Sequence, residues 1–250
     1  MKAFSVIGIS KTGKTTTIEN IIRGLKKRNY SVGSIKEIHF DGFAIDTPGT
    51  NTDRHRNAGS ELVTARGYHE TDMMFPSKLP IEEILRYYDQ DYVIMEGVKD
   101  YNIPKIACAD KKDELEKIFD RSVFAVSGKI SGKLDEFRGV VAIDSISEAE
   151  KLIDLIEEKV FDVLPDFPAD CCGECGFDCR ELGCRILEGK SKRQDCIISD
   201  SNIKLIIDGR EIAMVPFVQN LLKGTLEGLI KNLKGYRNGK TIEIKIGSKK

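Results

Sequence analysis

Short apolar runs alternate with helical patterns along the N-terminal part of the chain. Continuous apolar runs typical of buried strands lie in "AFSVIGI", "SVGSIK", "YVIME", "VFAVS" and "VVAID". Apolar positions recur at helical spacing in "TTTIENIIRGLKKRN", "PIEEILRYY" and "ISEAEKLIDLIEEKV". Because parallel sheets are covered by helices on both faces, this alternation predicts an α/β fold. We expect a mostly parallel sheet with helices on both faces.

The pattern changes at the two prolines of "VLPDFPAD". Beyond them comes a cysteine-rich stretch, and then Asp208-Gly209 separates two apolar runs, which is a hairpin signal. A helical pattern from about Phe217 to Leu233 and a last strand, "TIEIKI", follow. We therefore expect an α/β domain, a cysteine-rich segment and a C-terminal ββαβ unit, at residues 1–164, 165–200 and 201–250.

Composition and charge narrow the class of protein. The chain has 250 residues, of which 40% are hydrophobic and 32% charged, and its formal net charge of −1 gives no electrostatic basis for nucleic-acid binding. The N-terminus lacks the apolar region of a secretory signal, and no apolar run approaches the length of a membrane span. We expect a cytoplasmic protein with no membrane or nucleic-acid partner, whose thiols stay reduced.

The strongest chemical motif is "GISKTGKT" at residues 8–15, which fits G-x-x-x-x-G-K-[ST] between a strand and a helix. Glycines let the backbone wrap a phosphate with its N–H groups pointing inward, and the helix N-terminus adds its positive end. Lys14 would bridge the β- and γ-phosphates, and the Thr15 hydroxyl would coordinate Mg²⁺. The motif predicts a P-loop fold whose nucleotide ligands are Gly8, Ser10, Lys11, Thr12, Gly13, Lys14, Thr15 and Thr16.

A second magnesium ligand is expected at the end of another buried strand. Glu96 follows the apolar run in "DYVIMEG", so it lies at the edge of the sheet where open α/β folds bind ligands. A carboxylate there can hold Mg²⁺ directly or through water. The alternative is an exposed glutamate at a strand end.

The segment between the second and third predicted strands is long, polar and rich in Gly and Thr. Loops of this length in a compact domain are usually functional or disordered. We expect a switch-like loop that faces the phosphates. Its candidate polar side chains are His39, Asp41, Asp46, Asp53, Arg54 and His55.

Three stretches together resemble a known family: "GISKTGKTT", "IKEIHFDGFAIDTPGTNTDRHRNAGS" and "YVIMEGVKDYNIPKI". They look like the molybdopterin-guanine dinucleotide biosynthesis adaptor proteins, the B proteins of that pathway, over roughly residues 1 to 150. The resemblance implies a GTP-binding protein that assists the molybdopterin guanylyltransferase in attaching GMP, and a homodimer. It places Asp46, Arg54, His55 and Gly59 in the signature loop. Thr50-Asn51 stand where the family has a basic residue and then an aspartate.

Guanine preference comes from this resemblance alone, because the chain has no Asn-Lys-x-Asp run. No glutamine or arginine is assigned from sequence to orient water or to neutralise transition-state charge. We therefore name no catalytic residue and expect at most a slow GTPase.

Six of the seven cysteines lie between residues 171 and 196. Cys172, Cys175 and Cys179 are closely spaced, and Cys196 follows after sixteen residues. Four thiolates at one centre suit a [4Fe–4S] cluster or Zn²⁺. The cluster is favoured over zinc because there is no second Cys-x-x-Cys arm and all three histidines lie in the first domain.

The cysteine layout also resembles the iron–sulfur domain of corrinoid iron–sulfur proteins. Those show Cys-Gly-x-Cys-Gly, a third cysteine, a helix with a Gly-Lys pair and a fourth cysteine; Gly189-Lys190 match that pair. One residue is missing here between the second and third cysteines. Cys184 is expected to pack on a helix, Cys171 to be an alternative ligand, and Cys108 to be buried and structural.

Two functions of different class follow. The first is a GTP-binding accessory protein of molybdenum- or tungsten-cofactor maturation with an appended cluster. The second is a nucleotide-gated electron-transfer protein that reduces a partner through the cluster. Reductases of the nitrogenase iron-protein type carry a lysine directly after the first P-loop glycine, where this chain has Ile9. That difference favours the first function; a P-loop kinase has no support, since no acceptor-binding lid is evident.

Overall fold

The computed structural model describes residues 1–167, 172–173, 175–196, 203, 205–207, 210–212 and 214–234. The contacts divide the chain into two compact units. The first comprises Met1–Asp166 and Cys179–Arg193, and the second comprises Phe167–Asp178 and Gln194–Lys250. Each unit is described by itself below.

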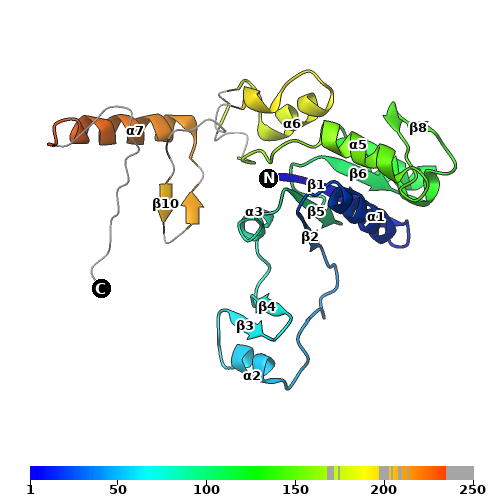
Figure 1. Cartoon of the computed structure of the whole chain (residues 1–250), viewed down its shortest axis with the longest axis horizontal. Helices are drawn as coiled ribbons and strands as arrows, with labels where there is room; N and C mark the ends of the chain where they lie inside the picture. The colour runs from blue at the N-terminus through cyan, green and yellow to red at the C-terminus, as the bar shows by residue number, and fades with distance from the viewer. Residues whose placement is uncertain are drawn as a thin grey trace. The chain divides into compact units, whose positions relative to one another are not determined.

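A five-stranded sheet forms the centre of the first unit (Figure 1). Every strand pairs in parallel with its neighbour, as the apolar pattern predicted. The interior strands are almost completely buried, because helices cover both faces. In sheet order the strands are β2 (Val32–Lys36), β5 (Tyr92–Glu96), β1 (Lys2–Ile7), β6 (Lys105–Cys108) and β7 (Val123–Ser127).

The prediction that "VVAID" forms a strand of the central sheet was wrong. Only Val140–Val141 (β9) of "VVAID" is a strand, and it pairs antiparallel with Glu136–Phe137 (β8). Arg138 and Gly139 between them both have positive φ, at 51° and 78°, which is typical of a tight two-residue hairpin turn. This turn sends the apolar run into a separate small ribbon, with a single bridge from Ala142 to Val126.

The fifth strand of the sheet is instead β6, which the apolar pattern missed. It has four residues and begins at Lys105, a charged residue that interrupts the apolar run. Lys105 is nevertheless buried, because its ammonium group pairs with Asp120 at 3.3 Å. Burial of a paired lysine at the start of a strand leaves no hydropathy signal in the sequence.

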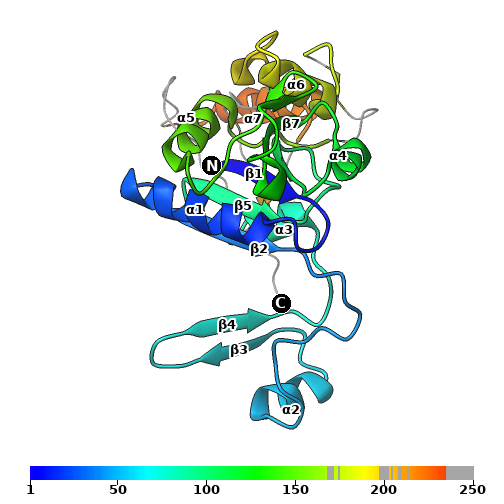
Figure 2. The same ribbon diagram turned by 90° about the vertical axis from the view of Figure 1, so that its right-hand side faces the viewer.

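Helices cover both faces of the sheet (Figure 2). On one face, α1 (Lys14–Lys27) and α5 (Ala149–Lys159) bury Ile21, Leu25 and Ile153 against β1, β5 and β6. On the other face, α3 (Ile81–Leu85) and α4 (Lys112–Ile118) bury Leu85 and Leu115. Burial of these apolar stripes fixes α1, and with it the loop that precedes α1, on the sheet.

The segment between β2 and β5, expected to be a long loop, has secondary structure of its own. It contains α2 (Asn51–Asn57) and an antiparallel ribbon of β3 (Val63–Arg66) and β4 (Thr71–Met74). Thr50 caps α2, because its hydroxyl accepts a hydrogen bond from the Asp53 amide at 3.3 Å. The polar composition that suggested a loop is therefore that of a capped, solvent-exposed helix.

The remaining described elements follow α5. They are α6 (Cys179–Leu187), the 3₁₀ turn η2 (Arg193–Asp195), β10 (Leu205–Ile207), β11 (Arg210–Ile212) and α7 (Pro216–Ile230). β10 and β11 pair antiparallel, and α7 follows them. The predicted strand "TIEIKI" lies outside the described residues. In the part of the chain that the structure describes, no helix has the length and apolar character needed to cross a membrane.

Candidate functional site

The loop between β1 and α1 passes so close to β6 that its first residue, Gly8, could not carry a side chain. At Gly8 the φ angle is 155°, and an added Cβ would lie 2.2 Å from the Cys108 carbonyl oxygen. At Gly13, the residue before α1, φ is 99°. Only glycine adopts this backbone path without strain. The two glycines of the motif are therefore required by the geometry of the loop.

The N-terminus of α1 is open to an anion. No side chain caps Gly13, and the first turn of the helix contains no acidic residue. The first backbone N–H groups of a helix have no partner within the helix, and the helix dipole makes this end positive. A phosphate group fits such a helix end, and the glycine-rich loop that precedes it.

Lys14 is folded back onto the loop. Its Nζ donates a hydrogen bond to the Ile9 carbonyl at 2.6 Å, and the Thr12 hydroxyl donates to the same oxygen at 3.0 Å. Burial lowers the pKa of Lys14, while the nearby Glu96 carboxylate opposes that shift. Ser10, Lys11 and Thr16 are exposed, and Thr12 is buried.

The side chains of Thr15 and Glu96, the two residues expected to bind magnesium, lie close together. The Thr15 hydroxyl lies 3.3 Å from Oε1 and 3.4 Å from Oε2 of Glu96. β1 and β5 are neighbours in register, so the carboxyl end of β5 lies beside the loop that follows β1. A hydroxyl and a carboxylate together are the oxygen ligands that Mg²⁺ takes. The donor set therefore fits magnesium. In the structure, the Lys36 ammonium group contacts this carboxylate, with Nζ 2.6 Å from Oε1.

A contact that the sequence did not indicate supports the loop from the other side. η1 (Gly128–Ile130) follows β7, and the Lys129 amide donates to the Thr12 carbonyl at 3.1 Å. A Cβ at Gly128 would lie 2.3 Å from the same Thr12 oxygen. In the sequence, this contact was indicated only by Gly128, a glycine directly after the buried strand β7.

The candidate residues of the segment 39–55 are not joined to the P-loop. In the described structure, no hydrogen bond or ion pair links Asp46, Arg54 or His55 to residues 8–15. Arg54 and His55 are exposed on α2. Asp46 Oδ1 accepts from the Thr50 hydroxyl at 2.7 Å, which lowers its pKa, and its Oδ2 is buried without a hydrogen-bond partner.

Asp53 has a structural task in the same segment. Its carboxylate accepts from the Gly49 amide at 2.8 Å, from Arg56 at 2.8 Å and from Asn57 at 3.1 Å. The hydrogen bond from Gly49 is the main reason that the pKa of Asp53 is lowered. Asp53 therefore fixes α2 to the turn before it, and its acceptor capacity is used internally.

The described cysteines are all thiols, with no disulfide among them. Cys172, Cys175 and Cys179 are half-buried and Cys196 is buried. Among the described residues, no three His, Cys, Asp or Glu side chains are grouped closely enough to hold a metal ion. Cys179 belongs to the first unit, and the other three candidate ligands belong to the second. Cys171 lies outside the described residues.

Two other cysteines are packing residues, as predicted. Cys108 is completely buried in β6, and burial raises the pKa of its thiol to about 12. Its Sγ lies 3.7 Å from the Thr17 hydroxyl. Cys184 is buried on α6, and burial raises its pKa as well. Both thiols are therefore held protonated within apolar packing.

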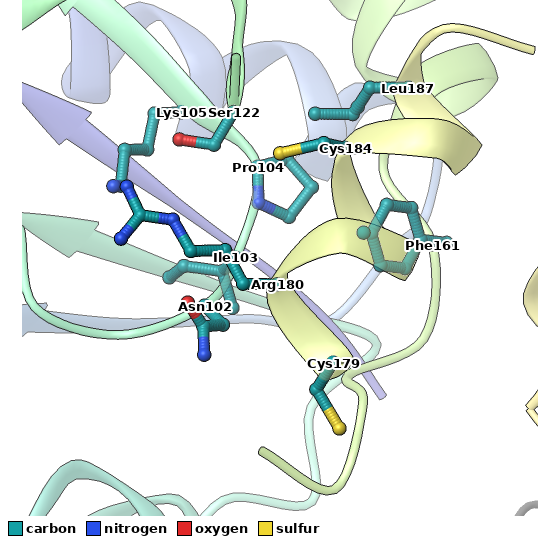
Figure 3. A pocket seen from close by; sticks show the side chains of 11 residues that line it. Asn102, Ile103, Pro104, Lys105, Ser122, Phe161, Cys179, Arg180, Cys184 and Leu187 are labelled. Atoms are coloured by element: carbon teal, nitrogen blue, oxygen red, sulfur yellow. The ribbon is translucent and has the colours of Figure 1, made fainter. Parts of the chain in front are cut away.

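A separate small cavity of the first unit lies beside α6 (Figure 3). It is at the ends where β6 and β7 begin, opposite the edge that carries the P-loop. Its wall is mainly apolar, and Cys184 points toward Pro104 and Ser122, whereas the Cys179 sulfur points away from them. Lys105 and Arg180 on the rim both approach Asp120, at 3.3 Å and 3.6 Å. Asp120 can offset only one of these two positive charges. Because the wall is mainly apolar, we interpret the cavity as a gap in the packing of α6.

The chain is similar to known proteins of one family. The model of the family "MobB: Molybdopterin guanine dinucleotide synthesis protein B" matches residues 3–128. A molybdopterin-guanine dinucleotide biosynthesis adapter protein of Methanocaldococcus jannaschii is 31% identical over 253 residues, covering 98% of this chain and 97% of that protein. The chain belongs to the MobB family.

Other members show how far the MobB likeness extends. The adapter protein of Escherichia coli is 29% identical over 160 residues, which is 60% of this chain and 87% of that protein. The crystal structure of Bacillus subtilis MobB has a TM-score of 0.53 at 20% identity, covering 65% of this chain and all of that one. The latter shows the shared fold. The residues matched by the MobB model include the P-loop, α2 and Glu96. The resemblance of the first part of the chain to the molybdopterin-guanine dinucleotide adapter proteins is therefore confirmed.

Proposed function

We propose that this MobB protein is a GTP-binding accessory protein of molybdenum- or tungsten-cofactor biosynthesis, which assists the attachment of GMP to molybdopterin. The observation that carries the proposal is the approach of Thr15 to Glu96 beside an open helix N-terminus. Relatives that are named as molybdopterin-guanine dinucleotide biosynthesis adapter proteins supply the pathway.

The P-loop residues have distinct tasks in this proposal. The amides of Gly13 and its neighbours hold the phosphates, and Lys14 leaves the Ile9 carbonyl to bind the β- and γ-phosphates. Thr15 and Glu96 would hold Mg²⁺, and the bound ion would neutralise phosphate charge. Ser10, Lys11, Thr12 and Thr16 complete the phosphate-binding loop.

The segment around α2 is proposed to close over the nucleotide. Arg54 and His55 are exposed and available to a ligand, and Asp46 keeps one carboxylate oxygen without a hydrogen bond. Guanine recognition remains part of the proposal, because it rests on the family. The absence of an assigned water-orienting glutamine or a charge-neutralising arginine in the P-loop site supports slow hydrolysis by the isolated protein.

We propose the molybdopterin guanylyltransferase as the partner, in the cytoplasm, and a homodimer as the assembly. The segment between β2 and β5 supports a protein-binding role, because it presents large apolar side chains to solvent. Phe40 and Ile45 are 70% and 75% exposed, and Tyr68 is fully exposed.

The cysteine segment is proposed to hold a [4Fe–4S] cluster on Cys172, Cys175, Cys179 and Cys196, with zinc as the alternative. The proposal rests on the spacing of the four thiols, and the described residues contain no preformed group of three metal ligands. Ligand sites of this type assemble when the metal binds, because the thiols must first lose their protons. No step of the nucleotide chemistry is assigned to the cluster.

Calorimetry with GTP and magnesium tests the central part of the proposal. The wild-type protein is expected to bind GTP, and Lys14→Ala is expected to lose this binding while keeping its circular dichroism spectrum. ATP in a parallel titration tests the guanine preference. Binding of neither nucleotide by folded wild-type protein would contradict the proposed function.

A further inference from the structure

Lys36 occupies a fixed place at the phosphate edge of the sheet. It is the last residue of β2 and lies in register with Glu96, the last residue of β5. The pairing continues one step further, because the Glu37 amide donates to the Glu96 carbonyl at 2.9 Å. The backbone of Lys36 is therefore held beside Glu96, while the side chain is 59% exposed and free to change rotamer.

The Lys36 ammonium group pairs with the Glu96 carboxylate, which we propose as a magnesium ligand. Its Nζ lies 2.6 Å from Oε1 of Glu96, and the Thr15 hydroxyl approaches the same oxygen at 3.3 Å. The Glu96 side chain is only 13% exposed, so its charge requires a compensating partner. The neighbouring acid, Glu37, cannot share Lys36 in the same way, because Lys78 engages it at 2.6 Å.

Among the described residues, Lys36 is the one ion-pair partner of Glu96. Glu96, Lys36 and Lys99 each act electrostatically on Lys14. An isolated carboxylate at this position would repel an incoming triphosphate. With Lys36 on it, Glu96 presents no net charge to the ligand. A lysine suits this task, since its compact charge sits on a flexible stem that can swing away.

We propose that Lys36 is the internal counter-cation of Glu96, which stands in for magnesium in the metal-free protein and allows the triphosphate to bind before the metal. The inference rests on the proposed function, because a nucleoside triphosphate is the ligand. Magnesium and Lys36 are alternative partners of one carboxylate. When the metal takes Glu96, the Lys36 side chain turns to the phosphates or to solvent.

The test is GTP affinity, measured by calorimetry with EDTA and again with saturating magnesium. Lys36→Met leaves Glu96 uncompensated, so metal-free affinity is expected to fall by about tenfold or more. With magnesium the ion neutralises Glu96, and the loss is expected to be less than about threefold. Lys36→Gln is a second uncharged variant, and circular dichroism checks that each variant is folded.

Two further variants separate this role from simple phosphate binding. Lys36→Arg keeps the charge and is expected to retain metal-free affinity. Lys36→Met combined with Glu96→Gln removes the uncompensated carboxylate, so metal-free affinity is expected to return to near the wild-type value. Equal losses with and without magnesium, or no loss in either condition, would overturn the inference. Wild-type protein that binds no GTP in either condition would instead refute the nucleotide site itself.

Discussion

The Thr15 hydroxyl lies within 3.4 Å of both carboxylate oxygens of Glu96, although 81 positions separate these residues along the chain. The parallel neighbours β1 and β5 bring them together, since both strands end at the same edge of the sheet. This edge also carries the glycine loop and the N-terminus of α1. Ligands of open α/β folds bind at such an edge, so the pair connects the architecture to the proposed metal site.

Glu96→Gln is expected to weaken the magnesium dependence of GTP binding more than binding itself. The amide keeps the shape of the side chain but loses the charge that attracts Mg²⁺. We expect the magnesium concentration for half-maximal binding to rise by about tenfold. Glu37→Gln is the matched control, because Glu37 is also a strand-end acid but pairs with Lys78. Coinciding magnesium titrations of Glu96→Gln and wild type would show that Glu96 is not at the metal.

Lys14→Ala is expected to abolish detectable GTP binding without unfolding the protein. Lys14 makes one hydrogen bond to the Ile9 carbonyl in the ligand-free loop, so little stability depends on it. Its charge is the main side-chain contact that the β- and γ-phosphates would gain. Lys26→Ala, at an exposed position in the last turn of α1, is the control and is expected to bind like wild type. Unchanged affinity of Lys14→Ala in calorimetry rules out the P-loop assignment.

Gly8→Ala is expected to destabilise the first unit by about 2–3 kcal/mol and to impair nucleotide binding. The added Cβ would lie 2.2 Å from the Cys108 carbonyl oxygen, a backbone atom that cannot move alone. Gly132→Ala is the control, since its Cβ would have no atom within 4 Å. Urea unfolding measures both variants. Equal midpoints for the two would mean that the loop does not approach β6 this closely.

The cysteine prediction concerns metal content. Serine at Cys172, Cys175, Cys179 or Cys196 is expected to reduce iron in anaerobically purified protein, because each thiolate would be a cluster ligand. Cys184→Ser is expected to retain iron, since Cys184 is buried in packing on α6. Metal analysis with electron paramagnetic resonance measures this. Colourless wild-type protein with stoichiometric zinc would make the segment a zinc site instead.

Most of the P-loop site could be predicted from local sequence. Strand, glycine loop and helix are contiguous, and Glu96 ends an apolar run, so each part leaves its own signal. The partners on other strands could not be assigned to the site from sequence. Lys36 ends β2 and Gly128 follows β7, and both reach the site only through the order of the sheet. β6 was missed for a related reason. Lys105 interrupts its apolar run, and whether a charged residue is buried depends on a distant partner, here Asp120.

The segment around α2 shows a different limit. Its polar residues were predicted to bind a ligand from a loop. The Asp53 carboxylate instead accepts a hydrogen bond from the Gly49 amide, which fixes α2 to the turn before it. Hydrogen bonds within a short helix cannot be distinguished from ligand contacts by residue type. Whether Asp46, Arg54 and His55 reach the nucleotide depends on contacts outside the segment, which periodicity does not encode.

Nucleotide-dependent docking tests the central claim most directly. The protein is expected to capture the molybdopterin guanylyltransferase more strongly with a non-hydrolysable GTP analogue than with GDP, and to hydrolyse GTP slowly when alone. A partner that completes such a site can supply about 10³ to 10⁵ in rate. Lys14→Ala is expected to lose the difference between the two nucleotides. Capture that is the same with either nucleotide, or fast GTP turnover by the isolated protein, would contradict the account.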